Sequence, residues 1–248
     1  MKYIIKYKSP NYNSRNKSKI QLIIIHYTAL RNTKEAITYL CTKEKKVSAH
    51  YLISQDGEIY NLVNDKFRAW HAGQSFWQDI VDINSFSIGI ELDYNPNGKN
   101  NKFSSKMISS LKKLILKIKD KYKINKKNIL AHSDIAPFRK KDPGKYFPWK
   151  LLGNAKIITN FQDITKNDTK IIEDWFNKYN IKSKKRIIIF ALSLIGYDTS
   201  QVYKNLKYYN MLIAAYKSRY VRELTYVNQE TVYTNIIKHL FKNLLTKN

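Results

Sequence analysis

Three side chains that can bind a metal ion or stabilise a negative charge lie close together in the second half of the chain. His132, Lys140 and Asp142 fall within eleven residues, on a segment whose prolines and glycine argue against a helix. A second histidine, His26, follows an apolar run far upstream. Two histidines and an aspartate that leave a fourth position open are a ligand set suited to a catalytic zinc ion.

Each of these residues also has a simpler explanation. A histidine after three isoleucines, as at His26, is more often a buried core residue than a metal ligand, and the same holds for His132. The sequence Asp142-Pro143-Gly144 taken alone is typical of a turn in which the aspartate accepts local amide hydrogen bonds. Residue spacing alone therefore leaves both interpretations open.

Glu91 adds weight to the catalytic interpretation. In the run 87–92 a period of two places Ile88, Ile90 and Leu92 on one face of a strand, and Gly89 and Glu91 on the other. A carboxylate on a central strand is unfavourable without a partner, so Glu91 is either half of a buried salt bridge or a general base. Lys140 could stabilise an oxyanion, although a lone lysine is usually solvated.

Strands alternate with amphipathic helices over the first 160 residues. Apolar runs predict strands at 22–25, 87–92 and 129–131, and residues 50–63 predict a hairpin that turns at Asp56-Gly57. Apolar residues at spacings of three and four predict helices at 33–42 and from Ser104 or Ser105 to about Tyr122. This alternation predicts an α/β fold with a mixed β-sheet flanked by helices.

The remaining residues predict helices alone, at 171–179, 185–195, 201–220 and 230–245. We therefore expect two domains: an α/β domain at 1–160 and a small all-α C-terminal domain at 161–248.

Composition limits the other classes. A net charge of +26 suggests nucleic acid as a partner, but the lysines are spread along the whole chain and no nucleic-acid-binding motif occurs, so we expect no specific nucleic-acid binding. Polyanionic cell-wall material would suit the same charge. The single Cys41 excludes an internal disulfide. No apolar run predicts a transmembrane segment, and no signal peptide or lipid-anchor cysteine is evident, which favours the cytoplasm over the periplasm or cell wall.

Five separated blocks carry a resemblance to a known family. They are residues 24–28 with His26, 47–60 with His50, 69–75 with Trp70 and His71, 86–92 with Glu91, and 131–144 with His132 and Asp142. Their content and order resemble the type 2 N-acetylmuramoyl-L-alanine amidases, the AmpD- and AmiD-like zinc enzymes related to peptidoglycan recognition proteins.

The resemblance implies one zinc ion bound by His26, His132 and Asp142, with Glu91 as the general acid and base and Lys140 as the electrostatic helper. It implies hydrolysis of the amide between N-acetylmuramic acid, including its 1,6-anhydro form, and L-alanine of the stem peptide. It places His71 in substrate contact. His50 is expected in substrate contact, in support of the residues that make that contact, or in packing, and Trp70 in packing or stacked on a sugar.

The C-terminal part is a weaker match. Residues 191–197 and the helix after them resemble the small helical peptidoglycan-binding module of AmiD-like amidases. The module's Ala-Phe-Gln-x-x-Phe signature is replaced by residues 215–220, Ala-Tyr-Lys-Ser-Arg-Tyr. The alternative to a binding module is a helical cap that stabilises the catalytic domain.

Two other functions remain open from the sequence. One is a non-catalytic peptidoglycan sensor, which loss of a zinc ligand would favour, and the other is a basic nucleic-acid-binding protein. The leading interpretation has peptidoglycan or muropeptide fragments as the partner. The sequence does not decide between anhydro-muropeptides and intact peptidoglycan, and it leaves the oligomeric state unknown.

Overall fold

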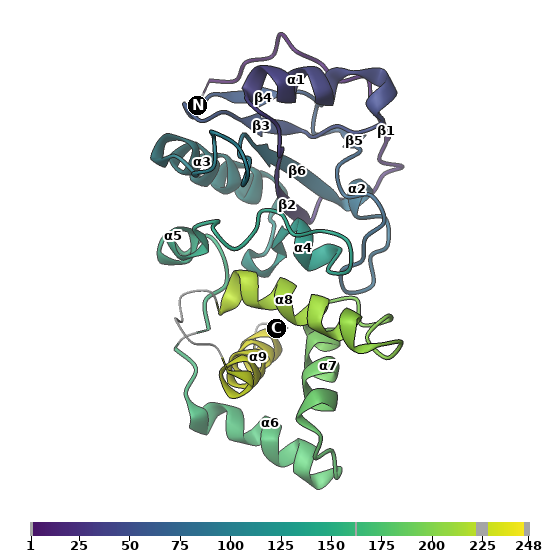
Figure 1. The fold of residues 1–248 in the computed structure, drawn as a ribbon, viewed down its shortest axis with the longest axis vertical. Coiled ribbons are helices and arrows are strands. Elements are labelled where there is room, and N and C mark those ends of the chain that lie inside the picture. Colours follow the sequence, from purple (N-terminus) through teal and green to yellow (C-terminus); the bar gives the residue numbers. More distant parts are fainter. Residues whose placement is uncertain (1, 162, 222–227, 246–248) are drawn as a thin grey trace.

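A five-stranded mixed sheet forms the centre of the N-terminal part of the molecule (Figure 1). The computed structural model of the chain describes residues 2–161, 163–221 and 228–245. In the sheet the strand order is β4-β3-β6-β2-β7, and a separate two-stranded sheet pairs β1 with β5. The strands are β1 (Tyr12–Ser14), β2 (Leu22–Tyr27), β3 (Tyr51–Ile53), β4 (Ile59–Asn61), β5 (Phe67–Ala69), β6 (Ser87–Leu92) and β7 (Ile129–Ala131).

In the described part of the chain, five α-helices are interleaved with the strands or follow them, and four more lie in the C-terminal part. They are α1 (Thr33–Cys41), α2 (Ile83–Phe86), α3 (Ser105–Tyr122), α4 (His132–Ile135), α5 (Trp149–Asn154), α6 (Lys166–Lys178), α7 (Lys184–Ile195), α8 (Leu206–Tyr220) and α9 (Gln229–Leu245). The predicted fold class, a mixed sheet flanked by helices with further helices at the C-terminal end, is confirmed. None of the helices in the described ranges is both long and apolar enough to cross a membrane.

Local signals in the sequence account for several of the predicted elements, although the helix expected at 201–220 begins at Leu206 and the one expected at 171–179 begins at Lys166. Ser104 caps α3, because its hydroxyl accepts a hydrogen bond from the Met107 amide at 3.1 Å. Gly57 takes a φ of +81° in the turn that joins β3 to β4, and a Cβ atom there would lie 2.8 Å from the Lys106 carbonyl oxygen at the start of α3. Glycine at this turn therefore also allows α3 to approach the hairpin.

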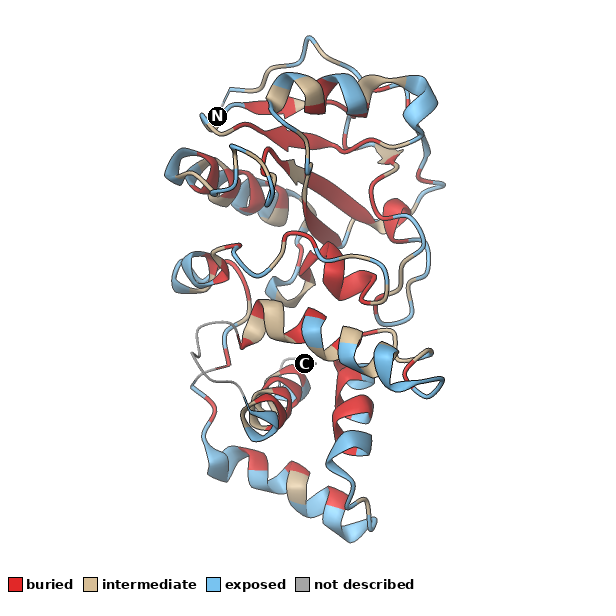
Figure 2. Ribbon diagram, viewed as in Figure 1, coloured by how far each residue is buried: buried red, intermediate tan, exposed pale blue. Residues whose placement is uncertain are grey.

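One face of the sheet packs against α3. Its apolar side chains alternate along the strands, with Ile23 and Ile25 from β2 and Ile88 and Ile90 from β6 joining the apolar stripe of α3 in one cluster. All four of these isoleucines are completely buried, and Figure 2 shows the strands as a buried layer. Burying this layer supplies the main hydrophobic stabilisation of the sheet.

The opposite face carries polar residues toward one end and apolar residues elsewhere. Leu22, Ile24 and Leu130 on this face belong to the same hydrophobic cluster as residues of α6, α7, α8 and α9. The C-terminal helices therefore share a core with the sheet, although α9 packs mainly against α6 and α7. The division into domains at residue 160 stays a prediction, and residues 162, 222–227 and 246–248 of the second predicted domain lie outside the described residues.

A buried ion pair joins the two parts of the chain. The Arg219 guanidinium of α8 donates to the carboxylate of Asp134 in α4, and both side chains are buried. The Tyr197 hydroxyl donates to the same carboxylate at 2.7 Å, and Arg219 also donates to the Ile129 carbonyl at 2.6 Å. The guanidinium lies over the Trp149 ring, 4.4 Å from its centroid. Residues 85 positions apart thus fix α8 onto the strand β7 and the turn α4 that follows it.

We predict that Arg219→Met lowers the free energy of unfolding by about 3–5 kcal/mol, because it leaves the Asp134 carboxylate buried without its charged partner. Urea denaturation measures the effect. Glu230→Gln is the control, since the Lys184–Glu230 pair between α7 and α9 is exposed and should contribute less than about 1 kcal/mol. Equal losses in the two variants would contradict a special role for the buried pair.

Candidate metal centre

Parallel strand pairing brings three of the predicted site residues to one edge of the sheet. His26 of β2 is the register partner of Glu91 of β6. On the other side of β2, Ile25 is paired with Ala131, the residue just before His132. Because the strands are parallel, their carboxyl ends lie at the same edge, and because the registers agree, the three side chains share one face.

His26, His132 and Asp142 form a compact buried cluster at this edge. Nδ1 of His26 lies 2.9 Å from Nδ1 of His132 and 3.1 Å from Oδ2 of Asp142, and Nδ1 of His132 lies 2.9 Å from the same Oδ2. All three residues are less than a tenth exposed. Within the described residues they are the group of histidine, cysteine and acidic side chains close enough to hold one metal ion.

The chemistry of the three atoms fits a divalent cation. Nε2 of His132 lies 3.0 Å from the Ala72 carbonyl oxygen, which can only accept, so the ring proton is on Nε2 and Nδ1 presents a lone pair. Asp142 contributes a carboxylate oxygen to the same space. Tetrahedral zinc bonds of 2.0–2.1 Å would place ligand atoms about 3.3 Å apart, close to the observed spacing. A cation bound between these three atoms would interact with lone pairs that otherwise point toward one another.

Burial and proximity set the charges of the cluster. Burial lowers the pKa of His26 to about 4, so this ring is neutral near pH 7 and can act as a ligand. Burial alone would raise the pKa of Asp142, but its contacts with His132 and His26 outweigh that effect and hold the value well below the usual range. A neutral imidazole and an ionised carboxylate are the forms that bind zinc.

The segment between His132 and Asp142 begins with a helical turn, contrary to the expectation of no helix. Residues His132–Ile135 form α4, because the Asp134 carboxylate accepts a hydrogen bond from the Ala131 amide at 2.8 Å and caps the turn. The segment then loops back, and the Ser133 amide donates to the Asp142 carbonyl at 3.0 Å. This closure returns Asp142 to the side of His132.

Glu91 points to the same region without a hydrogen-bonding partner. The residue is partly exposed, but its Oε2 atom is buried and unpaired within the described residues. Burial and, secondarily, the charge of Asp142 raise the pKa of Glu91 to about 8, although Lys140 acts in the opposite direction. The salt bridge considered for Glu91 from the sequence is absent among the described residues, where no ion pair to it is found. Lys140 is partly buried, and its amide donates to the Ala136 carbonyl at 2.9 Å.

The two remaining histidines of the sequence blocks lie behind the cluster, in the protein interior. His50 is completely buried, its Nδ1 accepts from the Gly89 amide at 3.0 Å, and its Nε2 lies 3.1 Å from the Phe67 carbonyl. Substrate contact does not fit this position, because both ring nitrogens are already engaged, and we propose a packing role for His50. His71 lies between His50 and His26, with Nδ1 3.0 Å from Nε2 of His26.

Trp70 lies at the end of the small sheet and is partly exposed. Its indole Nε1 donates to the Asn13 side-chain oxygen at 3.0 Å. Packing and sugar stacking both stay predictions for this residue.

Sequence reasoning did not identify the support provided by Asp134 and Arg219. An aspartate three residues after Ala131 is a capping signal that could have indicated a helical turn there. Nothing in the sequence indicates that Arg219 is its partner, because the two residues are distant in the chain and meet only through packing of α8 against α4.

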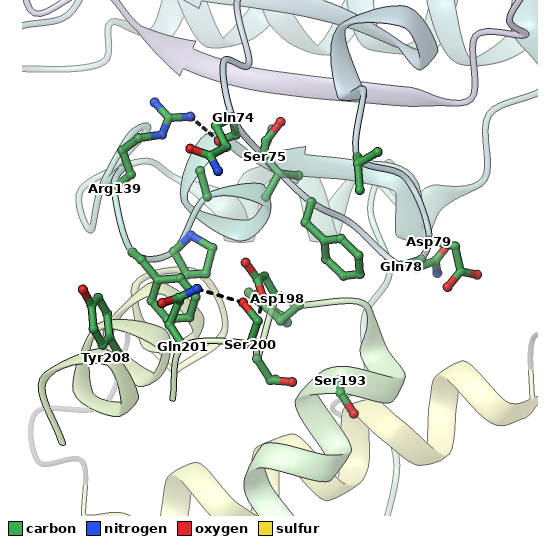
Figure 3. Close-up of a pocket in the computed structure, with 18 of the residues that line it drawn as sticks. Gln74, Ser75, Gln78, Asp79, Arg139, Ser193, Asp198, Ser200, Gln201 and Tyr208 are labelled. Atoms are coloured by element: carbon green, nitrogen blue, oxygen red, sulfur yellow. Dashed lines mark hydrogen bonds between the residues drawn. The ribbon is translucent and has the colours of Figure 1, made fainter. Parts of the chain in front are cut away.

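A cavity lies between α4 and the connection from α7 to α8 (Figure 3). Its volume is about 1280 Å³, and its wall includes Gln74, Arg139, Gln201 and Tyr208. Nη2 of Arg139 donates to the Gln74 and Ala72 carbonyls, each at 2.7 Å. The Ala72 carbonyl thus contacts both His132 and Arg139, a residue of the cavity wall. The side chains of His26, His132 and Asp142 do not line this cavity.

Comparisons with known proteins find relatives that match the sheet-containing part of the chain. A family model described as N-acetylmuramoyl-L-alanine amidase matches residues 16–145. The chain is 37% identical over 152 residues to N-acetylmuramoyl-L-alanine amidase AmiD of Escherichia coli, covering 56% of this chain and about half (54%) of AmiD. It is 37% identical over 163 residues to 1,6-anhydro-N-acetylmuramyl-L-alanine amidase AmpD of Haemophilus influenzae, covering 58% of this chain and 86% of that protein.

Solved structures extend the likeness to the C-terminal helices. Escherichia coli AmiD, in complex with the substrate anhydro-N-acetylmuramic acid-L-Ala-D-γ-Glu-L-Lys, has a TM-score of 0.74 at 26% identity and covers 96% of this chain and 93% of its own. Pseudomonas aeruginosa AmpDh3, in complex with anhydromuramic pentapeptide, has a TM-score of 0.75 at 27% identity and covers 96% and 95%. Since the family model matches 130 of the 248 residues, and the match covers more than two thirds of the AmpD relative, the chain belongs to the N-acetylmuramoyl-L-alanine amidase family.

Proposed function

We propose that this protein hydrolyses the amide bond between N-acetylmuramic acid and L-alanine of the peptidoglycan stem peptide, using one zinc ion. The observation that carries the proposal is the convergence of two histidine nitrogens and one carboxylate oxygen next to a buried, unpaired Glu91 oxygen. The names and the bound muropeptides of the related amidases support the bond and the substrate class. The 1,6-anhydro form is included, because the AmpD relative is named for it.

His26, His132 and Asp142 would hold the zinc ion. Bound there, zinc would activate a water molecule for attack and polarise the carbonyl group of the scissile amide. The protein supplies two imidazole rings and one carboxylate in a buried setting, so a dication gains more from the site than it would from exposed ligands.

Glu91 is proposed to carry the proton during hydrolysis. Its pKa of about 8 lies near neutral pH, where a carboxyl group can both accept and release a proton. The unpaired Oε2 atom has no protein hydrogen bond to break before it accepts a proton from water. Glu91 would then deliver that proton to the nitrogen of the departing L-alanine.

Lys140 is proposed to stabilise the negative charge that develops on the carbonyl oxygen. Its charge acts on both Glu91 and His26, lowering the pKa of each, so it lies close to the proposed reaction centre. The backbone bond from Lys140 to Ala136 fixes where its side chain begins. Its flexible four-carbon side chain can then place the ammonium group beside the substrate.

Removal of the metal should abolish the reaction. We expect the purified protein to release free peptide beginning with L-alanine from anhydro-muropeptides, to lose this activity in a chelator, and to regain it with added zinc. Mass spectrometry of the digestion products measures the outcome, and intact peptidoglycan in a parallel digestion reports the preferred substrate form. Cleavage within the glycan, or activity indifferent to the chelator, would contradict the proposal, and binding without cleavage would indicate a sensor.

Glu91→Gln should keep the zinc ion while losing turnover. An amide side chain retains the shape of Glu91 but cannot accept the proton, so we expect kcat to fall about 10²- to 10⁴-fold. Steady-state kinetics and metal analysis of the same preparation measure the two effects separately. A variant with normal kcat would show that another group moves the proton, whereas loss of zinc would place Glu91 in the metal site.

The raised pKa of Glu91 also predicts a pH-dependent stability of the metal-free protein. The folded protein binds this proton more tightly than the unfolded chain, with a pKa of about 8 against 4.5, so stability falls as the pH rises between these values. Relative to Glu91→Gln, the wild-type protein should lose roughly 3–5 kcal/mol between about pH 5 and pH 8. Urea denaturation with a chelator present measures it, and parallel stability curves for the two proteins would contradict the buried acid.

A further inference from the structure

His71 contacts the ligand histidine His26 from the side opposite the metal cluster. Its Nδ1 atom lies 3.0 Å from Nε2 of His26, and the two rings meet edge to face with centroids 5.1 Å apart. His71 is 8% exposed and both of its ring nitrogens have protein partners. The expected substrate contact by His71 does not fit this position.

The Ile83 carbonyl, at the end of a series of contacts through Ser87, determines which atom of each hydrogen-bonded pair carries the proton. The Ile83 carbonyl lies 2.6 Å from the Ser87 hydroxyl oxygen, and a carbonyl can only accept, so Ser87 donates to it. The Ser87 oxygen therefore accepts in its 3.2 Å contact with Nε2 of His71, which must carry the ring proton. Nδ1 of His71 is then a lone pair and accepts the proton of Nε2 of His26.

The consequence for His26 is a single tautomer. With its proton on Nε2, His26 directs the lone pair of Nδ1 toward Nδ1 of His132 and Oδ2 of Asp142. The opposite tautomer would place a proton in the space where the three ligand atoms converge. Second partners of this kind raise the basicity of a ligand imidazole and fix its orientation.

Gly89 makes the space that His71 occupies. A Cβ atom at Gly89 would lie 2.3 Å from Cγ of the His71 ring, so no other residue fits there without moving the ring. Gly89 stands on β6 between Ser87 and Glu91, on the same face as both. The backbone of His71 is held by the Asn84 side chain, whose oxygen accepts from the His71 and Ala72 amides at 3.0 and 2.8 Å.

We propose that His71 is a positioning residue that, anchored by Ser87 and seated over Gly89, holds His26 in the tautomer that leaves Nδ1 free for the metal ion. The adjacent Ala72 carbonyl does the same for His132, so two consecutive residues orient both histidine ligands. The inference rests on the proposed zinc site, but it concerns the metal-free protein as well. It accounts for a buried histidine and a strand glycine that the proposed reaction does not use.

The first readout is the His26 tautomer in the metal-free, full-length protein. Nitrogen-15 NMR of the histidine rings should find the His26 proton on Nε2 in the wild type. In His71→Phe, which keeps a ring but removes the acceptor, we expect a mixture of tautomers. A wild-type His26 with its proton on Nδ1, or a pure Nε2 tautomer in His71→Phe, would overturn the inference whatever the protein does with zinc.

The second readout is zinc affinity, measured by competition with a chromogenic chelator. We expect His71→Phe to bind zinc about 10- to 100-fold more weakly, with much of the activity restored at saturating zinc. Gly89→Ala should weaken binding similarly with His71 still present, because it displaces the ring. Unchanged affinity in these variants would overturn the inference, whereas absence of zinc binding by the wild type would instead refute the proposed function.

Two further variants protect the test against misfolding and against general effects of removing a buried histidine. Ser87→Ala leaves the His71 ring in place but removes its anchor, and it should shift the His26 tautomer even if His71→Phe does not fold. His239→Phe is the matched control, since His239 is equally buried in α9, where it stacks on Phe161. It should leave both the tautomer and the zinc affinity unchanged, and an effect equal to that of His71→Phe would overturn the inference.

Discussion

The parallel register of β2 between β6 and β7 is the constraint on which the site depends. It places His26 level with Glu91 on one side and with the start of α4 on the other. A shift of one residue in either pairing would turn a site residue toward α3, into the apolar face. The isoleucines on that face therefore do more than stabilise the sheet, because their burial decides which residues of the same strands face the metal cluster.

The same register buries polar side chains on the other face of the sheet, and these side chains need hydrogen-bonding partners. Carboxylate and imidazole groups lie in the interior, where each unpaired atom is unfavourable. Four histidine rings lie next to one another there, and the protons of their ring nitrogens are directed to carbonyl, hydroxyl or imidazole acceptors. The Nδ1 atoms of His26 and His132 instead face the Asp142 carboxylate, where the metal ion is proposed to bind. The Oε2 atom of Glu91, to which the proposed reaction assigns the proton transfer, is among the buried atoms without a partner in the described residues.

The C-terminal helices support this arrangement through α4. Asp134 receives hydrogen bonds from its own turn, from Tyr197 and from Arg219, and it lies two residues after His132. A shift of α8 would therefore be transmitted through Asp134 to His132, a proposed metal ligand. From these contacts we propose that the helical part supports the site, which is the alternative to a binding module considered from the sequence, and peptidoglycan binding by these helices also stays a prediction.

The sequence by itself predicted the strands at 22–25, 87–92 and 129–131 and the capped helix α3, because hydrophobic periodicity and capping are local properties. The cluster residues His26, His132 and Asp142 were named by the family resemblance, and the structure brings them together. The sequence did not reveal the turn α4, the position of His71 behind His26, or the pairing of Arg219 with Asp134. Those depend on contacts between residues far apart in the chain. The tertiary structure decided them, because only the packed sheet and helices bring Nδ1 of His71 to 3.0 Å from Nε2 of His26 and the Arg219 guanidinium to the Asp134 carboxylate.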